Sequence, residues 1–333
     1  SHRGVSQGMS AHPTVERSPT RGLLRRDRAG DTAVRPRGDA PSGRAPALLQ
    51  PCGDEVDLCV LTEAELAAVR AGEGASIKHR HGRYWQSTRR GFYQPVHMMS
   101  RVRASEATRP SPLCWGYRIA LAEEDADAAN ATIPLYLLAD VAGFAEGLSR
   151  NRKGDLRKCR RLVEFQVLHD PSILLEQGHR VFISAIEGRG DCKPMTEAEY
   201  RRRVQSAFEH RTQIVAGLIR GDLAGYFVAC AVDGILYLDH TFVCPDARRT
   251  GIGTGLYVVS IENALRSGRV HAVCNSFHTP EVPSLCHYKE SLGFVVDQVP
   301  ARLAMPGPVL TFVRHREPAV YYRLTGDLPA SLA

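Results

Sequence analysis

Three apolar segments followed by one long amphipathic stretch form the clearest hydrophobic pattern of the chain. Residues 213–219, 225–232 and 235–243 are rich in β-branched and aromatic residues, as buried strands are. Short turns that contain Gly separate these segments, and such turns join neighbouring antiparallel strands. From Leu256 to Leu265 the apolar residues follow a helical spacing. The pattern predicts an antiparallel meander that leads into a helix.

The segments that follow complete the predicted sheet. Residues 271–275 form an apolar run that we expect to pair in parallel with the last strand of the meander. A helix is predicted over 283–292 and a strand over 294–299. After a loop that contains Pro, residues 309–314 and 319–324 are predicted to form a final pair of strands.

Shorter elements are predicted in the N-terminal half. Thr62 and Glu65 have the spacing of a capping box, so a helix is expected from there to Gly72. Aromatic and β-branched runs separated by turns then predict short strands. These runs lie at 79–85, 89–93, 96–102, 115–119 and 133–138.

Two further helices are predicted in the C-terminal half. Residues 149–162 contain seven basic residues and one acid, Asp155, while apolar residues recur at three- and four-residue intervals. One stripe of this helix should therefore face a core and the basic residues should face outward. Thr196 and Glu199 form a second capping box, which predicts a helix to about His210.

The chain has 333 residues and a formal net charge of +7, and much of the positive charge lies near its start. Residues 1–50 contain nine Arg and four acids among Pro, Gly and Ser, with few large apolar side chains. Such a segment cannot bury enough apolar surface to offset its ordering entropy, so a disordered basic tail is predicted. We expect an N-terminal α+β region over 51–148 and the main domain over 149–333.

The distribution of apolar residues and cysteines limits the cellular compartments in which the protein is expected. The start of the chain has no continuous apolar segment typical of a secretory signal, and no run of about twenty apolar residues occurs. A cytoplasmic protein without a membrane partner is predicted. The nine cysteines include no Cys-x-x-Cys pair, which indicates neither a disulfide framework nor a zinc finger. His79 and His81 are predicted to share one face of a strand, but no ligand cluster lies nearby and no metal is expected.

A basic, glycine-rich loop joins the last strand of the meander to its helix. It reads Arg248-Arg249-Thr250-Gly251-Ile252-Gly253-Thr254-Gly255. A strand that leads through such a loop into a helix directs unpaired backbone N–H groups and the helix dipole at one point, which is an anion site. The loop lacks the Lys-Ser or Lys-Thr pair of a Walker A motif, and the Gly-x-Gly-x-x-Gly dinucleotide pattern also fails. A ligand that carries phosphate is predicted to bind here.

The spacing Arg248-x-x-Gly251-x-Gly253 resembles the pyrophosphate loop of the GNAT superfamily of acyl-CoA N-acyltransferases. Tyr288, followed by Gly293 and Phe294, is similar to the helix-to-strand junction near the end of the same fold. The resemblance covers roughly residues 149–324. It implies an α+β fold with a mixed, mostly antiparallel sheet flanked by helices, and an enzyme that moves an acyl group, in the first place acetyl from acetyl-CoA, to an amine. The acceptor would be a small molecule or a peptide.

The same resemblance implies where the cofactor would lie. Backbone N–H groups of the loop would hold the diphosphate, and the strand that ends at Phe242 and Val243 would separate from its neighbour to bind the pantetheine arm. Asn275 matches a position near that arm, although a strand-end turn residue is an equally good interpretation. The implied cofactor-binding residues are Phe242, Val243, Arg248, Arg249, Thr250, Gly251, Ile252, Gly253, Thr254, Gly255 and Asn275.

Two residues are candidates for proton transfer. Tyr288 matches the family tyrosine that donates a proton to the departing thiolate, although with Leu285 and Leu292 it would also make an ordinary core stripe. Strict strand alternation would place Asp239 on the face that carries Thr241 and Val243. A partly desolvated Asp239 would then accept the proton of the amine.

Several alternatives remain open at the level of sequence. The basic helix at 149–162 resembles the entry of Fem-type aminoacyl transferases, which use charged tRNA, although a solvated helix face is the simpler interpretation. In that branch the aromatic region from Tyr84 to Leu138 would be a degenerate first half. An inactive CoA-binding module is a further alternative. A relay through Cys274 or Cys286 is disfavoured, because no base is visibly paired with either thiol.

Overall fold

The strands of this protein form a single sheet to which both halves of the chain contribute. The structure is a computed structural model, and it describes residues 58–187 and 194–332, so the predicted tail lies outside the described residues. The strands are β1 Val60–Leu61, β2 Ile77–Arg80, β3 Arg83–Arg89, β4 Phe92–Pro95, β5 Gly116–Ala120, β6 Ala131–Leu138, β7 Glu164–Val167, β8 Gln213–Ile219, β9 Asp222–Val232, β10 Ile235–Val243, β11 Ala272–Phe277 and β12 Val295–Ala304.

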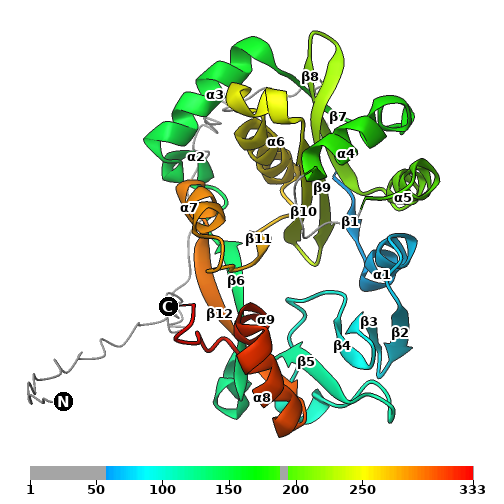
Figure 1. The fold of residues 1–333 in the computed structure, drawn as a ribbon, viewed down its shortest axis with the longest axis vertical. Helices are drawn as coiled ribbons and strands as arrows, with labels where there is room; N and C mark the ends of the chain where they lie inside the picture. The colour runs from blue at the N-terminus through cyan, green and yellow to red at the C-terminus, as the bar shows by residue number, and fades with distance from the viewer. Residues whose placement is uncertain (1–57, 188–193, 333) are drawn as a thin grey trace, which may run out of the picture. The chain divides into compact units, whose positions relative to one another are not determined.

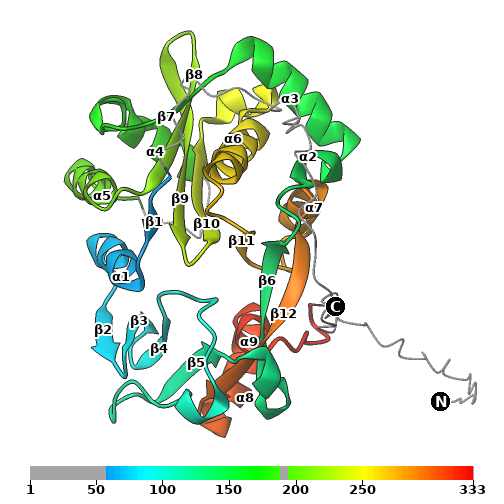
Figure 2. The ribbon, with the colours of Figure 1, turned by 180° about the vertical axis from the view of Figure 1, so that it is seen from behind.

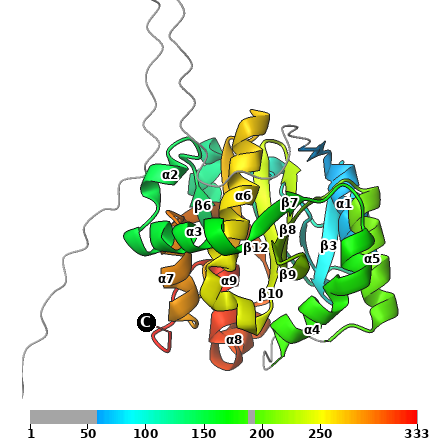
Figure 3. The same cartoon turned by 90° about the horizontal axis from the view of Figure 1, so that it is seen from above.

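The helices pack on both faces of this sheet. They are α1 Glu63–Gly72, α2 Phe144–Gly147, α3 Arg150–Leu162, α4 His179–Ile186, α5 Glu197–Glu209, α6 Ile252–Ser267, α7 Pro283–Ser291, α8 Gly307–Arg316 and α9 Pro318–Thr325. Figure 3 shows α3 and α6 on one side of strands β7–β10, and α1, α4 and α5 on the other. Each face encloses its own apolar core, one around α6 and one between α4, α5 and the sheet.

The strand order is β2-β3-β4-β5-β12-β6-β11-β10-β9-β8-β7, and β1 pairs in parallel with β9. Most neighbours are antiparallel, while β10 with β11 and β4 with β5 are parallel. The predicted mixed, mostly antiparallel α+β fold is therefore confirmed (Figure 1). Strand β6 from the N-terminal half lies between β12 and β11, so the sheet is continuous across residues 148 and 149. The division into two domains at that point stays a prediction.

The local signals at the helix starts are confirmed. Thr62 accepts a hydrogen bond from the N–H of Glu65, and the Glu65 carboxylate accepts one from the N–H of Thr62. Thr196 and Glu199 make the same reciprocal pair at the start of α5. The meander, α6, β11 and α7 also form within a few residues of the predicted bounds.

The predicted final pair of strands is wrong, because residues 307–316 and 318–325 are the helices α8 and α9 (Figure 2, red). Pro308 and Pro318 lie in the first turns of these helices, where a missing N–H costs nothing. The last strand of the sheet is instead β12, which continues through Pro300 to Ala304 and pairs with both β5 and β6.

Two expectations for the N-terminal half are also wrong. Residues 96–101 form turns rather than a strand, and only Val102 makes an isolated bridge, to Leu121. His79 lies in β2 and stacks on Tyr84, whereas His81 has a left-handed backbone in the turn after β2. The two imidazoles therefore do not share a strand face. No group of three metal-ligating side chains occurs in the described residues.

Candidate functional site

The loop between β10 and α6 leads directly into the N-terminal end of a long helix. Residues Pro245–Thr250 form a 3-10 turn, and Gly251 then reverses the chain with φ +82°. The N–H of Ile252 bonds the Thr250 hydroxyl at 3.3 Å and that of Gly255 bonds the Gly251 carbonyl at 3.0 Å. Helix geometry leaves the N–H groups of Gly253 and Thr254 without an intrahelical carbonyl. The positive end of α6 is thus open at these two amides.

The three glycines of the loop differ in what surrounds each of them. A Cβ at Gly251 would lie 2.8 Å from the Asp155 carbonyl oxygen of α3, in addition to the positive φ. At Gly255 a Cβ would lie 2.3 Å from the ring of Phe165. At Gly253 it would meet only the Tyr288 hydroxyl, at 3.8 Å. Gly253 is therefore the glycine that faces open space.

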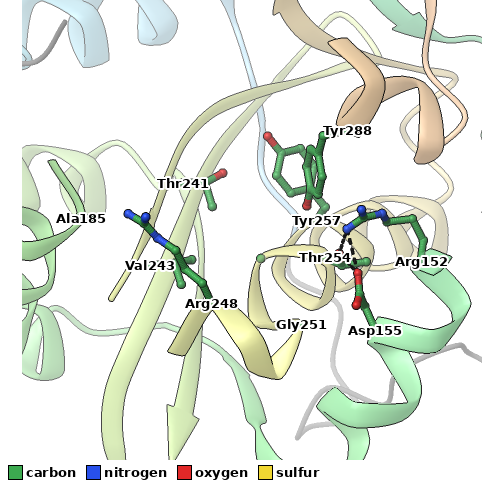
Figure 4. Close-up of a pocket in the computed structure, with 11 residues that line it drawn as sticks. Arg152, Asp155, Ala185, Thr241, Val243, Arg248, Gly251, Thr254, Tyr257 and Tyr288 are labelled. Carbon is green, nitrogen blue, oxygen red and sulfur yellow. Dashed lines mark hydrogen bonds and ion pairs between the residues drawn. The ribbon is translucent and has the colours of Figure 1, made fainter. Parts of the chain in front are cut away.

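Helix α3 covers this end of α6. Arg152 donates to the Asp155 carboxylate at 2.7 Å and to the Thr254 hydroxyl at 3.1 Å, and Thr254 donates to the same carboxylate at 3.3 Å (Figure 4). The Arg152 guanidinium also lies 4.7 Å from the centre of the Tyr288 ring. The Asp155 carboxylate and the Arg152 guanidinium therefore both lie beside the open amides.

The pocket above the loop has a volume of about 350 Å³. Figure 4 shows Arg248 on one side of it, Arg152 on the other, and Tyr257 and Tyr288 together. Its lining residues are Arg152, Asp155, Ala185, Thr241, Val243, Arg248, Gly251, Gly253, Thr254, Tyr257 and Tyr288. The structure thus brings together Val243, Arg248, three residues of the glycine loop and Tyr288 from the predicted set.

Burial raises the pKa of Tyr288, and the neighbouring Tyr257 adds to the shift, while Thr254 and Arg152 oppose it. The two rings meet edge to face with centres 5.8 Å apart. Burial also raises the pKa of Tyr257, whose hydroxyl interacts with Thr241 and Asn275. Both phenols therefore keep their protons near neutral pH.

Strands β10 and β11 separate beside this pocket. They pair only from Ile235 to Tyr237 on β10, and β11 then continues alongside β6. Beyond Tyr237, β10 keeps β9 as its neighbour but has no strand on its other side in the described residues. The predicted separation of the strand that ends at Val243 is therefore present, and it leaves backbone groups available to an extended ligand.

A bulge between Leu238 and His240 breaks the alternation that the sequence predicts along β10. Thr241 and Val243 line the pocket on the α6 face, whereas Asp239 lies on the opposite face, toward α1. The prediction that Asp239 shares a face with Thr241 and Val243 is wrong, because the extra residue reverses the parity. Phe242 also packs on the opposite face, among α4 and α5.

Asp239 lies where the two strands begin to separate. One oxygen accepts from Arg70 of α1 at 2.8 Å, and the other is buried without a hydrogen-bond partner. The adjacent His240 accepts from Arg203 at 2.6 Å, and burial together with this cation lowers its pKa. Asp239 is thus a buried carboxylate with one unpaired oxygen, on the face of β10 opposite the glycine loop.

The remaining candidate residues do not line the pocket. Asn275 is buried, its side-chain NH₂ lacks a hydrogen-bond partner, and its carbonyl accepts from Lys289 at 2.8 Å. Ile252 is buried in the core and Arg249 is exposed. The Thr250 hydroxyl is used within the loop. Burial raises the pKa of Cys274 to about 12, so this thiol is not an activated nucleophile.

Arg152, Asp155, Thr241 and Tyr257 line the pocket but are not among the site residues that the sequence predicts. For Thr241 and Tyr257 the spacing from the glycine loop is a usable signal, since one lies on the strand before it and one on the first turns of α6. No local signal places α3 against the loop. That contact depends on the tertiary packing of α3 on α6.

The sheet, the separated strands and the loop together define a GNAT-type fold, and the structural comparison supports the same class. No protein-family model and no curated protein sequence matches the chain. The solved structure of FemX is similar with a TM-score of 0.55 and 7% identity, over 75% of this chain and 93% of that chain. L-PGS from Bacillus licheniformis is similar with a TM-score of 0.50 and 13% identity, over 80% and 93%.

A third similar structure is the C-terminal domain of a protein proposed to be a lysylphosphatidylglycerol synthetase, from Agrobacterium fabrum. It has a TM-score of 0.51 and 8% identity, over 79% of this chain and 93% of that chain. These similarities extend over both halves of the chain, and at such identities they concern the fold. Separately, none of the described helices combines the length and the apolar character needed to cross a bilayer.

Proposed function

We propose that this protein is an acyltransferase that moves an aminoacyl group from the ester of a charged tRNA to an amine. The observation that carries the proposal is the position of α3, a strongly basic helix packed against the mouth of the pocket. Arg150, Arg157 and Arg161 lie on its exposed side. Thirteen residues of helix extend about 20 Å, which is longer than one diphosphate and suits a polyanion.

The surroundings of the loop also favour this donor over acyl-CoA. A diphosphate on the Gly253 and Thr254 amides would lie beside the Asp155 carboxylate, which already accepts from Thr254. Like charges at that distance repel. The likeness to FemX and L-PGS is in keeping with aminoacyl transfer.

The proposed reaction is direct attack of the acceptor amine on the ester carbonyl. A C–N bond forms, the C–O bond to the tRNA ribose breaks, and the departing oxygen takes a proton. Tyr288 is the proposed donor of that proton, because it is protonated and lies in the pocket. The Asp239 carboxylate, whose second oxygen is buried without a hydrogen-bond partner, is proposed to take the proton of the acceptor amine.

Binding measurements at several salt concentrations test the donor. We expect charged tRNA to bind with an affinity that falls steeply with salt, and replacement of Arg150, Arg157 and Arg161 by Gln to flatten the slope by about three. Arg202→Gln on α5 is the matched control, since its side chain is exposed on the opposite face. Equal slopes for the triple variant and the control would contradict the proposal.

Acyl-CoA is the second candidate donor, favoured by the open amides at Gly253 and the separation of β10 from β11. Thermal stabilisation by acetyl-CoA without tRNA binding would select it. In that case Gly253→Asp should abolish CoA binding in calorimetry, because it places a negative charge where the phosphate would lie. Gly253→Ala is the matched control.

A further inference from the structure

Asp155 of α3 lies where two hollows of the surface adjoin. One is the pocket above the glycine loop, and the other is a groove along α3 with a volume of about 770 Å³, and Asp155 lines both. The groove is otherwise lined by four cations, Arg150, Arg157, Lys158 and Arg161, together with uncharged residues. Asp155 therefore lies on the path between the basic groove and the pocket.

The charge of Asp155 is opposite to that of its surroundings. Helix α3 carries seven basic residues and this one acid. Among the described residues that line the pocket, Asp155 is again the only acid, and the other charged side chains are Arg152 and Arg248. Because like charges repel, a carboxylate at this place opposes the binding of a phosphate group and favours a cation.

The Asp155 carboxylate is held in place through one of its two oxygens. Oδ2 accepts from Arg152 at 2.7 Å and from Thr254 at 3.3 Å (Figure 4). Within residues 58–187 and 194–332, Oδ1 accepts no hydrogen bond, and 28% of the side chain is exposed. A carboxylate oxygen can accept two hydrogen bonds, so Oδ1 is available to a donor in a bound ligand.

A charged tRNA carries its negative and positive groups in the order that this surface requires. Its phosphates suit the cations of the groove, and the amino group of its aminoacyl ester is a cation at neutral pH, more so beside a carboxylate. That nitrogen is two bonds from the ester carbonyl carbon, so it enters the pocket with the reacting group. Asp155 and Tyr288, the proposed proton donor, both contact the Arg152 guanidinium. An ester beside Tyr288 therefore has its amino group near Asp155.

We propose that Asp155 binds the α-ammonium group of the aminoacyl ester and so selects donors that carry a free amino group. This inference rests on the proposed function and adds a specificity-determining residue to it. A tRNA without the aminoacyl group keeps the phosphate contacts of the groove but lacks the ammonium. The deacylated product is therefore bound less tightly than the charged donor, which favours its release after transfer.

Binding of alanyl-tRNA is compared with binding of lactyl-tRNA, in which a hydroxyl of similar size replaces the ammonium. The wild-type protein should bind alanyl-tRNA about tenfold more tightly, as expected for one charge-assisted hydrogen bond. Asp155→Asn should bind both alike, because the amide keeps the shape but not the charge. Asp246→Asn is the matched control, since this exposed acid precedes the glycine loop without lining the pocket, and it should keep the preference. A preference that persists in Asp155→Asn would overturn the proposal.

A second variant leaves Asp155 in place. Arg152→Met removes the cation that shares the carboxylate, so the preference for alanyl-tRNA over lactyl-tRNA should increase severalfold. An unchanged or smaller preference would overturn the proposal. Salt-sensitive binding of both tRNAs without any preference in the wild type would remove the role of Asp155 and leave the proposed function standing. Absence of salt-sensitive binding for both, and for deacylated tRNA, would remove the proposed donor and this inference with it.

Discussion

Single residues decide how the glycine loop is built. Gly251 adopts a left-handed backbone against the Asp155 carbonyl, Gly255 packs on Phe165, and only Gly253 faces the pocket. The sequence pattern treats these three glycines alike. Their roles separate only when the helix and strand that touch each one are known.

Gly251→Ala should destabilise the fold by roughly 1–3 kcal/mol, because Ala at positive φ is strained and its Cβ would lie 2.8 Å from a backbone oxygen. Gly253→Ala is the matched comparison, since its φ is ordinary and its Cβ has room. Urea unfolding of both variants measures the difference. Equal stability of the two would show that the close contact with α3 is not formed.

Tyr288→Phe should lower kcat by roughly 10²-fold, the size expected when a proton donor is lost. The ring is kept, so its contacts with Arg152 and Tyr257 and the stability of the protein should change little. Because burial raises the pKa of Tyr288, its loss should not alter the rate profile between pH 6 and pH 9. Single-turnover rates are compared with those of Tyr321→Phe on α9. A Tyr288→Phe enzyme as fast as this control would remove Tyr288 from the mechanism.

At the scale of elements, α7 is joined to β11 through one buried amine. Lys289 donates to the carbonyl of Asn275 at 2.8 Å, to the Ser276 hydroxyl at 3.1 Å and to the Phe277 carbonyl at 3.4 Å. Ser276 has φ +54°, so these bonds hold a strained end of the strand. The same contact fixes α7 and therefore the neighbouring Tyr288 over the pocket.

Burial lowers the pKa of Lys289 from 10.5 to about 8 in the folded protein. Between these two values the unfolded chain binds more protons than the folded one, so the free energy of unfolding should rise with pH. Below pH 8 both states are protonated and this contribution is flat. Urea unfolding of wild type and Lys289→Met from pH 7 to 10 should show the rise only in the wild type. Parallel curves would contradict the lowered pKa.

In the molecule as a whole, side chains of the N-terminal half bond to β10 on the face opposite the pocket. Arg70 pairs with Asp239 at 2.8 Å, and the Tyr237 hydroxyl bonds His97 at 2.8 Å. These contacts join residues more than a hundred positions apart in the sequence. They hold both sides of the bulge where the strands separate.

Arg70→Met should destabilise the protein by about 3 kcal/mol, because Asp239 would keep a buried charge without its partner. Adding Asp239→Asn should restore much of that loss, since no charge is then left unpaired. A double-mutant cycle by urea unfolding gives the coupling between the two residues. Additive effects would mean that the ion pair does not stabilise the junction.

The local sequence predicts a large share of this fold. Both capping boxes, the meander, α3 and the glycine loop depend on neighbours within a few residues, and all are found. The prediction of strands at 309–314 and 319–324 is wrong because short apolar runs suit strands and helices alike. Pro308 and Pro318 are the signal that favours helices, since both lie in the first turn of a helix.

The site is predicted less completely than the fold, and β10 shows why. A bulge after Leu238 depends on pairing with β9, not on the sequence of β10 alone, and it moves Asp239 to the face opposite Thr241. Likewise, the placement of α3 over Thr254 depends on how α3 packs on α6.

Short-range sterics and hydrogen bonds specify the glycine turn, its open amides and the helices that begin at their own caps, so the amino-acid sequence is enough to predict them. Which distant side chains pair with one another follows instead from the packing of the whole fold. Arg152 donates to Thr254, Arg70 pairs with Asp239, and Arg118 has no acid beside it within residues 58–187 and 194–332, since such contacts form only when distant segments pack together.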